Sequence, residues 1–242
     1  MSRSGLRFPA RRPAYDRMVS DRQRCIISRA LGLSALVCRG HIEAAANEPK
    51  AVEMYELVLE WLLASGASDC LEREEGLLLV SPPGSLTRGE VARAVFRSEQ
   101  LGVLAWACGV VAPPSHDRHP HDRFLARRLG FLRRDAVAKL ERAATREHDV
   151  LHSYARLAVA VEDRLKRFAI DGAPVDFVRE YGRLPLRLVS GDLGFDGLPL
   201  AAVEAARWQL ALAAAVERAS AARWLLAPAP HRVVAPAVLG DA

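Results

Sequence analysis

No glycine or proline interrupts residues 133–168, a run of 36 residues. A run of this length and composition predicts either one long helix or two helices with an unmarked break between them. No stretch alternates apolar and polar residues for long enough to indicate a sheet, and no internal repeat occurs. We therefore predict an all-α fold with one long central helix.

Capping signals place further helices on both sides of this run. Ser20–Gln23 and Thr87–Glu90 have the form of a capping box, and Gly66 is placed to end a helix that begins with Pro49. The second capping box opens a helix that we expect to continue to about Gly109. The expected helices begin at Ser20, Pro49, residue 70, Thr87 and residue 199.

Both ends of the chain lack an apolar period. Residues 1–24 contain seven arginines against two aspartates, which accounts for the whole formal net charge of +5. Half of the 242 residues are hydrophobic, enough for one sizeable core. We predict a flexible basic arm over residues 1–18, a single multi-helix domain over 19–226, and a flexible tail over 227–242.

The cysteines and the apolar runs bear on the compartment. No C-x-x-C pair occurs, and each cysteine lies in or beside an apolar helical stretch: Cys25, Cys38, Cys70 and Cys108. This pattern favours four buried free thiols in a reducing compartment. The nearly uncharged runs at residues 101–112 and 208–216 are shorter than the ~20 residues of a membrane span, and no secretory signal follows the first arginines. We expect a cytoplasmic protein without a membrane span.

The apolar stretch FRSEQLGVLAWACGVV, residues 96–111, carries two charged residues near its start. Arg97 and Glu99 differ by about 200° around a helix, so they point to nearly opposite sides and cannot bridge each other. A buried Glu99 therefore needs a cationic or hydrogen-bonding partner from another helix. We interpret Arg97, Glu99 and Trp106 as anchors between helices. A ligand pocket that uses both charges is the alternative.

This stretch also resembles DUF4272, a bacterial family of unknown function. The matching motif is an aromatic-Arg-x-Glu sequence that leads into an apolar Leu-Trp-Ala-x-Gly segment: Phe96, Arg97, Glu99, Leu101, Ala105, Trp106, Ala107 and Gly109. The segments Arg29-Ala30-Leu31 and Leu59-Glu60-Trp61-Leu62 are similar as well, and the likeness extends to about residue 197. The resemblance implies a helical bacterial protein and brings no activity, cofactor or catalytic residue.

Histidines gather in two places. The loop at residues 112–122 contains His116, His119 and His121, and the long helical run contains His148 and His152 at a spacing of four. A helical histidine pair can begin a metal site, but zinc requires a third and a fourth ligand at fixed distances, and no HExxH motif occurs. We interpret the first group as a solvated loop and the second as exposed, and we expect no metal and no cofactor.

Residues 123–134, RFLARRLGFLRR, contain five arginines and no acid. We interpret this segment as a helix that buries its apolar side, with acidic residues such as Glu72, Glu74 and Glu75 nearby in the fold to neutralise it. The alternative is contact with nucleic acid or lipid. The possible anion contacts are Arg127, Arg128, Arg133 and Arg134.

The prediction of function rests mainly on the catalytic motifs that the sequence does not contain. No nucleophile elbow, P-loop or dinucleotide-binding fingerprint occurs, so we predict no catalytic residue. The last helix carries more apolar residues than one face buries, among them Leu200, Leu210, Val216 and Trp224. We therefore predict a protein-interaction or adaptor module that self-associates through this helix. The alternatives are a nucleic-acid-associated protein that uses residues 1–18 and 123–134, and a metal-dependent enzyme.

Overall fold

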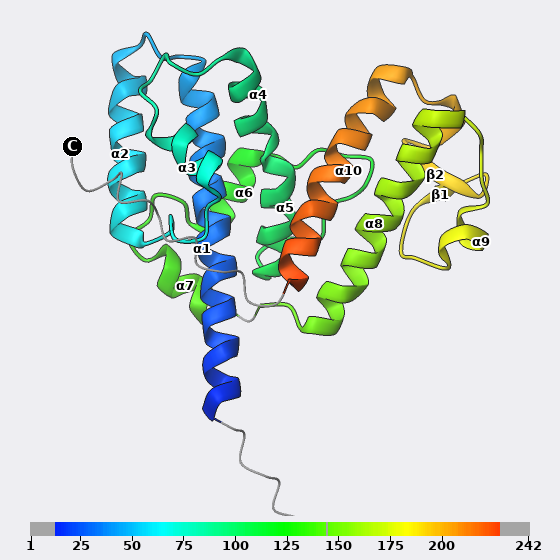
Figure 1. Ribbon diagram of the computed structural model, residues 1–242, viewed down its shortest axis with the longest axis horizontal. Helices are drawn as coiled ribbons and strands as arrows, with labels where there is room; N and C mark the ends of the chain where they lie inside the picture. The colour runs from blue at the N-terminus through cyan, green and yellow to red at the C-terminus, as the bar shows by residue number, and fades with distance from the viewer. Residues whose placement is uncertain (1–12, 144, 228–242) are drawn as a thin grey trace, which may run out of the picture.

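The computed structural model describes residues 13–143 and 145–227, with side chains from residue 21 onward (Figure 1). Helices make up most of the described residues, so the all-α prediction is confirmed, with a small three-stranded sheet added. Residues 1–12 of the predicted arm and 228–242 of the predicted tail lie outside the described residues. The predicted domain boundaries stay predictions.

The elements follow one another in the order shown in Figure 1. The helices are α1 (Pro13–Glu43), α2 (Pro49–Ser65), α3 (Arg73–Val80), α4 (Arg88–Phe96), α5 (Ser98–Ala107), α6 (Asp122–Leu129), α7 (Ala136–Arg142), α8 (His148–Asp171), α9 (Phe177–Tyr181) and α10 (Ala205–Leu226). The strands are β1 (Leu188–Val189), β2 (Asp192–Phe195) and β3 (Leu198–Pro199), and a 3-10 turn covers Leu200–Ala202.

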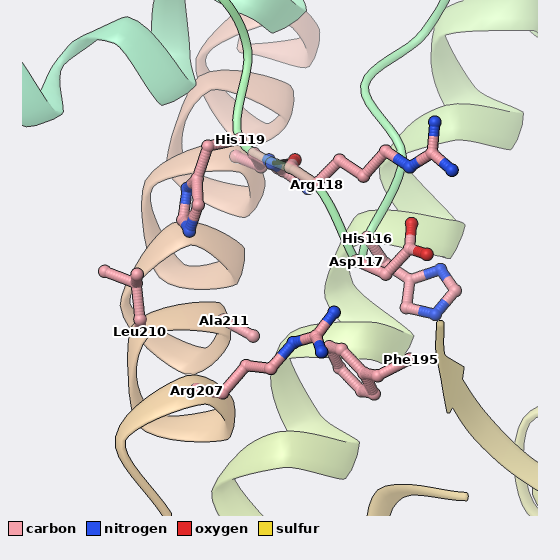
Figure 2. A pocket seen from close by; sticks show the side chains of 9 residues that line it. His116, Asp117, Arg118, His119, Phe195, Arg207, Leu210 and Ala211 are labelled. Carbon is pink, nitrogen blue, oxygen red and sulfur yellow. Dashed lines mark hydrogen bonds between the residues drawn. The ribbon is translucent and has the colours of Figure 1, made fainter. Parts of the chain in front are cut away.

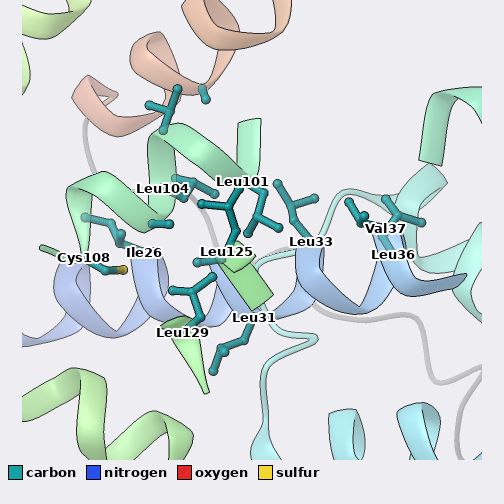
Figure 3. Packing of buried hydrophobic residues seen from close by; sticks show 14 of the residues in the cluster. Ile26, Leu31, Leu33, Leu36, Val37, Leu101, Leu104, Cys108, Leu125 and Leu129 are labelled. Carbon is teal, nitrogen blue, oxygen red and sulfur yellow. The ribbon is translucent and has the colours of Figure 1, made fainter. Parts of the chain in front are cut away.

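Helix α1 is the centre of the larger apolar cluster. Its side chains Ile27, Leu31 and Leu36 are fully buried, and Leu101 and Leu104 of α5 pack in the same cluster (Figure 3). The helix extends back to Pro13, so Ser20, which we expected to cap it, lies inside it. The uninterrupted run at residues 133–168 is two helices, α7 and α8, which were the second of its two predicted forms.

The segment Asp21–Glu43 of α1 is long and apolar enough to cross a membrane by length and composition. This segment was not among the apolar runs considered above as membrane spans. Most of its apolar window is buried inside the fold, and the core helix of a folded domain passes the same test. The segment by itself therefore does not indicate a membrane span.

Local capping signals correctly predicted several helix ends. Thr87 Oγ1 accepts a hydrogen bond from Glu90 N at 3.3 Å, and the Glu90 carboxylate accepts one from Thr87 N at 2.8 Å. Helix α2 begins with Pro49 and ends at Gly66, whose φ of 64° is left-handed. The helix predicted from Thr87 to about Gly109 is wrong as one element, because it breaks at Arg97 into α4 and α5.

A second apolar cluster joins α8, α9, the sheet and α10. Leu165, Phe177, Phe195 and Leu200 are almost completely buried in it. The sheet has the antiparallel order β1-β2-β3, and its two tight turns carry Gly191 and Gly197, both with positive φ. The sheet was not predicted, because strands of two to four residues are too short to show alternation.

One cysteine pair differs from the expectation of four free thiols. Cys25 of α1 and Cys70, just before α3, form a disulfide with a Cα–Cα distance of 6.0 Å. Cys38 and Cys108 are free, and burial raises the pKa of the first to about 11 and of the second to about 12. These two thiols therefore stay protonated and unreactive at neutral pH.

Reduction of the Cys25–Cys70 disulfide is expected to lower the free energy of unfolding by about 2–4 kcal/mol. The bond closes a loop with a sequence separation of 45, so it restricts the unfolded chain more than a short loop would. Urea unfolding with and without dithiothreitol measures the effect. A Cys25→Ala/Cys70→Ala variant should not respond to the reductant. Four reactive thiols in unfolded, unreduced protein would contradict the pairing.

Candidate functional site

The break at Arg97 directs the two charged motif residues to different helices. Arg97 Nη1 lies 2.6 Å from Glu217 Oε2 of α10, and Arg97 Nε lies 3.4 Å from Glu75 Oε1 of α3. Gln100 Nε2 donates to the same Glu217 oxygen at 2.7 Å. Arg97 therefore connects α3, α10 and the junction between α4 and α5.

Glu99 is buried, with only 1% of its side chain exposed. Its Oε2 accepts a hydrogen bond from Arg218 Nε of α10 at 2.7 Å, and its Oε1 lies 2.6 Å from His119 Nδ1. A buried Glu99 was expected to need a cationic or hydrogen-bonding partner from another helix, and that partner is Arg218 of α10. Two adjacent residues of α10, Glu217 and Arg218, thus bind the two charges of the motif.

Arg218 also organises the loop at residues 112–122. Its Nη1 donates to the carbonyl of Ser115 and its Nη2 to the carbonyl of Arg118. The loop approaches α5 closely, because a Cβ at Gly102 would lie 3.3 Å from Pro114 and 3.5 Å from Pro120. The ion pair between Glu99 and Arg218 therefore holds α5, α10 and this loop together.

Arg29 of α1 extends the buried charge network. Its Nη1 donates to Glu75 Oε2 and to the carbonyl of Cys70, each at 3.0 Å, and its guanidinium lies 5.2 Å from the ring centroid of Trp224. Burial raises the pKa of the Glu75 carboxyl, and the charge of Arg29 opposes that shift. Arg29 Nη2 also donates to Gln100 Oε1 at 3.4 Å, and Gln100 in turn donates to Glu217, which is the partner of Arg97.

Trp106 faces a different helix. Its ring stacks on Tyr154 of α8 with the centroids 4.5 Å apart, and both side chains are buried. Burial also raises the pKa of the Tyr154 hydroxyl, so this residue stays neutral. Arg97, Glu99 and Trp106 are not brought together into one cleft, because each contacts a different part of α8, α10 or α3.

The prediction of a solvated histidine loop is wrong for His116 but not for His119 and His121, which are exposed. His116 is buried, with its Nε2 2.8 Å from the carbonyl of Gly194, and burial lowers its pKa. His119 also contacts Glu99. His148 and His152 lie on an exposed part of α8 with ring centroids 4.4 Å apart. Among the described residues, no three metal-ligating side chains come together.

The basic segment forms α6 and the turn that follows it. Leu125 and Leu129 are buried, and the four arginines expected as anion contacts are exposed: Arg127, Arg128, Arg133 and Arg134. Arg128 donates to the carbonyl of Val110, and Arg133 to Asp135. The expectation that Glu72, Glu74 and Glu75 neutralise this segment is wrong for Glu72 and Glu75, because both bind Arg29 instead.

A pocket of about 210 Å³ lies where the loop meets α10 (Figure 2). Its lining residues are His116, Asp117, Arg118, His119, Phe195, Arg207, Leu210, Ala211 and Arg218. These residues offer cationic and apolar groups, and none of them is a serine, threonine or cysteine nucleophile. Arg207, Glu217 and Arg218 were not among the residues predicted to form a site. The one available signal was the Glu-Arg pair within the alanine-rich sequence ALAAAVERASAA.

Residues 8–175 match the family described as Domain of unknown function (DUF4272), so the chain belongs to this family. No curated protein and no solved structure matches the chain. The match ends before α9, the sheet and α10. The partners Glu217 and Arg218 therefore come from a part of the chain that the match does not cover.

Proposed function

For this DUF4272 member we propose a non-catalytic role as a protein-interaction module, with the outer face of α2 as its binding surface. The charged motif residues support this proposal because their contacts are internal. Arg97 binds Glu217 and Glu99 binds Arg218, and only 1% of the Glu99 side chain is exposed. Charged residues that pair with other helices of the same chain stabilise the fold, and a stable fold can present a binding surface.

The α2 face is the observation that carries the proposal. We define it as the exposed side of α2, over which four large apolar side chains are spread with exposed fractions from 39% to 52%: Val52, Met54, Leu57 and Leu63. The opposite side of the helix is buried, and Trp61 Nε1 donates to the carbonyl of Arg133 at 3.0 Å. Helix α2 lies at the edge of the molecule in Figure 1. Exposed apolar side chains gathered on one element are typical of an interaction site.

The charges beside the α2 face indicate what kind of partner it fits. Glu53, Glu56 and Glu60 are exposed on the same helix, and the helical spacing places them between the apolar side chains of the α2 face. An apolar surface flanked by lysine or arginine would complement it, since opposite charges at the rim steer association and select partners. We therefore propose a basic amphipathic segment of another protein as the partner, in the cytoplasm.

Helix α10 has less free apolar surface than the sequence suggested. Leu200, Val203 and Leu225 are buried within the chain, and Trp224 packs against the larger cluster. Of the expected surplus on α10, Leu210 and Val216 are exposed. Self-association stays a prediction. Helix α2 exposes four large apolar side chains and α10 exposes two, so α2 is the better surface for it.

A photo-crosslinking amino acid at Leu57 or Leu63 is expected to capture a partner of defined mass from host lysate. The same group at Ile170, which is 87% exposed on α8, serves as the control. Added Val52→Lys and Met54→Lys substitutions should reduce the adduct at least tenfold, because they place cations where the partner's basic border approaches. The adduct yield, read by mass spectrometry, is the measurement.

Two results would contradict this proposal. Capture at Ile170 as efficient as at Leu57 would show that the adducts are unspecific. No adduct at either Leu57 or Leu63 would show that the α2 face binds no partner in the lysate. Tight binding of random duplex DNA at about 0.2 M salt would favour the nucleic-acid alternative instead, with Arg127 and Arg134 as contacts. A cytoplasmic location would keep Cys25 and Cys70 as thiols, so the disulfide of the structure would then be open in the cell. Alkylation of the two cysteines in freshly lysed cells tests the location.

A further inference from the structure

We propose that the pocket between the loop and α10 binds a small organic carboxylate with an apolar body. We call it the α10 pocket and define it by the lining residues given above. Its volume of about 210 Å³ corresponds to roughly seven water molecules in the liquid. Sites for drug-sized ligands are larger, at about 300–1,000 Å³, so the ligand here has about the size of one substituted ring.

One wall of the α10 pocket is apolar. Phe195 of β2 and Ala211 of α10 are buried, and Leu210 stands partly exposed beside them. The Phe195 ring meets the His116 ring edge-on, with centroids 5.4 Å apart, which fixes the orientation of both rings. An aromatic or branched aliphatic body would be removed from water against these side chains.

The other side of the α10 pocket is cationic. Arg207 presents a guanidinium whose side chain is 40% exposed, and in Figure 2 it extends from α10 toward the loop, whereas the Arg118 guanidinium points away from α10. Two carboxylates oppose them, Asp117 in the lining and Asp196, which binds Arg207. The Arg207–Asp196 pair is solvent-exposed, and such pairs contribute little to stability. A ligand carboxylate can therefore replace Asp196 at the Arg207 guanidinium, with bidentate geometry.

The loop that carries Arg118 is held in place before any ligand arrives. Arg218 binds the carbonyls of Ser115 and Arg118 and is itself paired with Glu99. His119 is held by the same carboxylate. A preformed wall lowers the entropic cost of binding. The motif residue Glu99 thus acts here as a positioning residue for the α10 pocket.

Isothermal titration calorimetry with phenylacetate tests the proposal. We expect one phenylacetate bound per chain and at least tenfold weaker binding of phenylacetamide, which has the same shape without the charge. Arg207→Gln should weaken phenylacetate binding at least tenfold. Ala211→Leu should abolish binding, because the added atoms fill the apolar end. Arg179→Gln, an exposed arginine of α9, is the matched control and should leave binding unchanged.

The proposal is overturned if phenylacetate fails to bind the unaltered protein at millimolar concentration, or if phenylacetamide or inorganic phosphate binds equally well. Unchanged affinity in Arg207→Gln would also overturn it, since this side chain lies at the surface and its loss leaves the fold intact. The α10 pocket shares no residue with the α2 face, so each proposal can fail without the other.

Discussion

Arg218→Met is expected to lower the free energy of unfolding by about 3–5 kcal/mol, because it leaves the buried Glu99 carboxylate without its arginine and with only the half-exposed imidazole of His119 beside it. The same substitution removes the donors to the carbonyls of Ser115 and Arg118. Methionine keeps an unbranched apolar stem in place of the arginine stem, so most of the loss comes from the missing guanidinium, its charge and its hydrogen bonds. Urea unfolding followed by circular dichroism measures the change, with the slope of the transition checked for constancy.

A second arginine of α10 provides the control. Arg223 pairs with Glu162 but keeps 54% of its side chain exposed, and Glu162 retains Lys166 as a partner. Arg223→Met should therefore cost no more than about 1 kcal/mol. If Arg218→Met proves no more destabilising than Arg223→Met, the ion pair with Glu99 does not hold α10 in place.

Arg164→Met is expected to cost a similar amount, about 3–5 kcal/mol, at the other end of the molecule. Arg164 of α8 has no exposed side-chain surface, and its Nε donates to Asp192 Oδ1 at 2.8 Å. Its Nη2 donates to Asp192 Oδ2 and to the carbonyl of Ala173, 2.7 Å away. The substitution leaves a buried aspartate on β2 and frees the segment between α8 and the sheet.

Limited trypsin digestion locates the effect of Arg164→Met. Cleavage after Arg183 and Arg187, which lie between α9 and β2, should become faster than in the unaltered protein. Arg167→Met on the same helix is the control, since its pairs with Asp163 and Glu180 are half-exposed. Equal cleavage rates in the Arg164 and Arg167 variants would show that the Arg164–Asp192 pair does not stabilise this part of the chain.

The helix ends that the sequence predicted correctly depend on neighbouring residues. Thr87 and Glu90 cap each other across three positions, and Gly66 ends α2 because it adopts a left-handed conformation. The break at Arg97 could not be predicted in this way. No glycine or proline marks it, and the contacts of Arg97 with α3 and α10 appear only when the chain is folded.

The candidate site was predictable only in part. The direction of Glu99 and its need for a cation follow from helix geometry and the cost of a buried charge. The identity of that cation does not, because Arg218 is separated from Glu99 by 119 positions in the sequence. The Cys25–Cys70 pair and the burial of His116 against β2 are likewise long-range contacts, and no local pattern reports them.

A double-mutant cycle on Glu99 and Arg218 tests most directly whether the ion pair between these two residues holds α10 against the rest of the fold. Unfolding free energies of Glu99→Gln, Arg218→Met and the double variant give the coupling between the two side chains. We predict a coupling of about 2 kcal/mol or more, with the double variant more stable than the two single losses imply. Losses that add to within about 0.5 kcal/mol would contradict it.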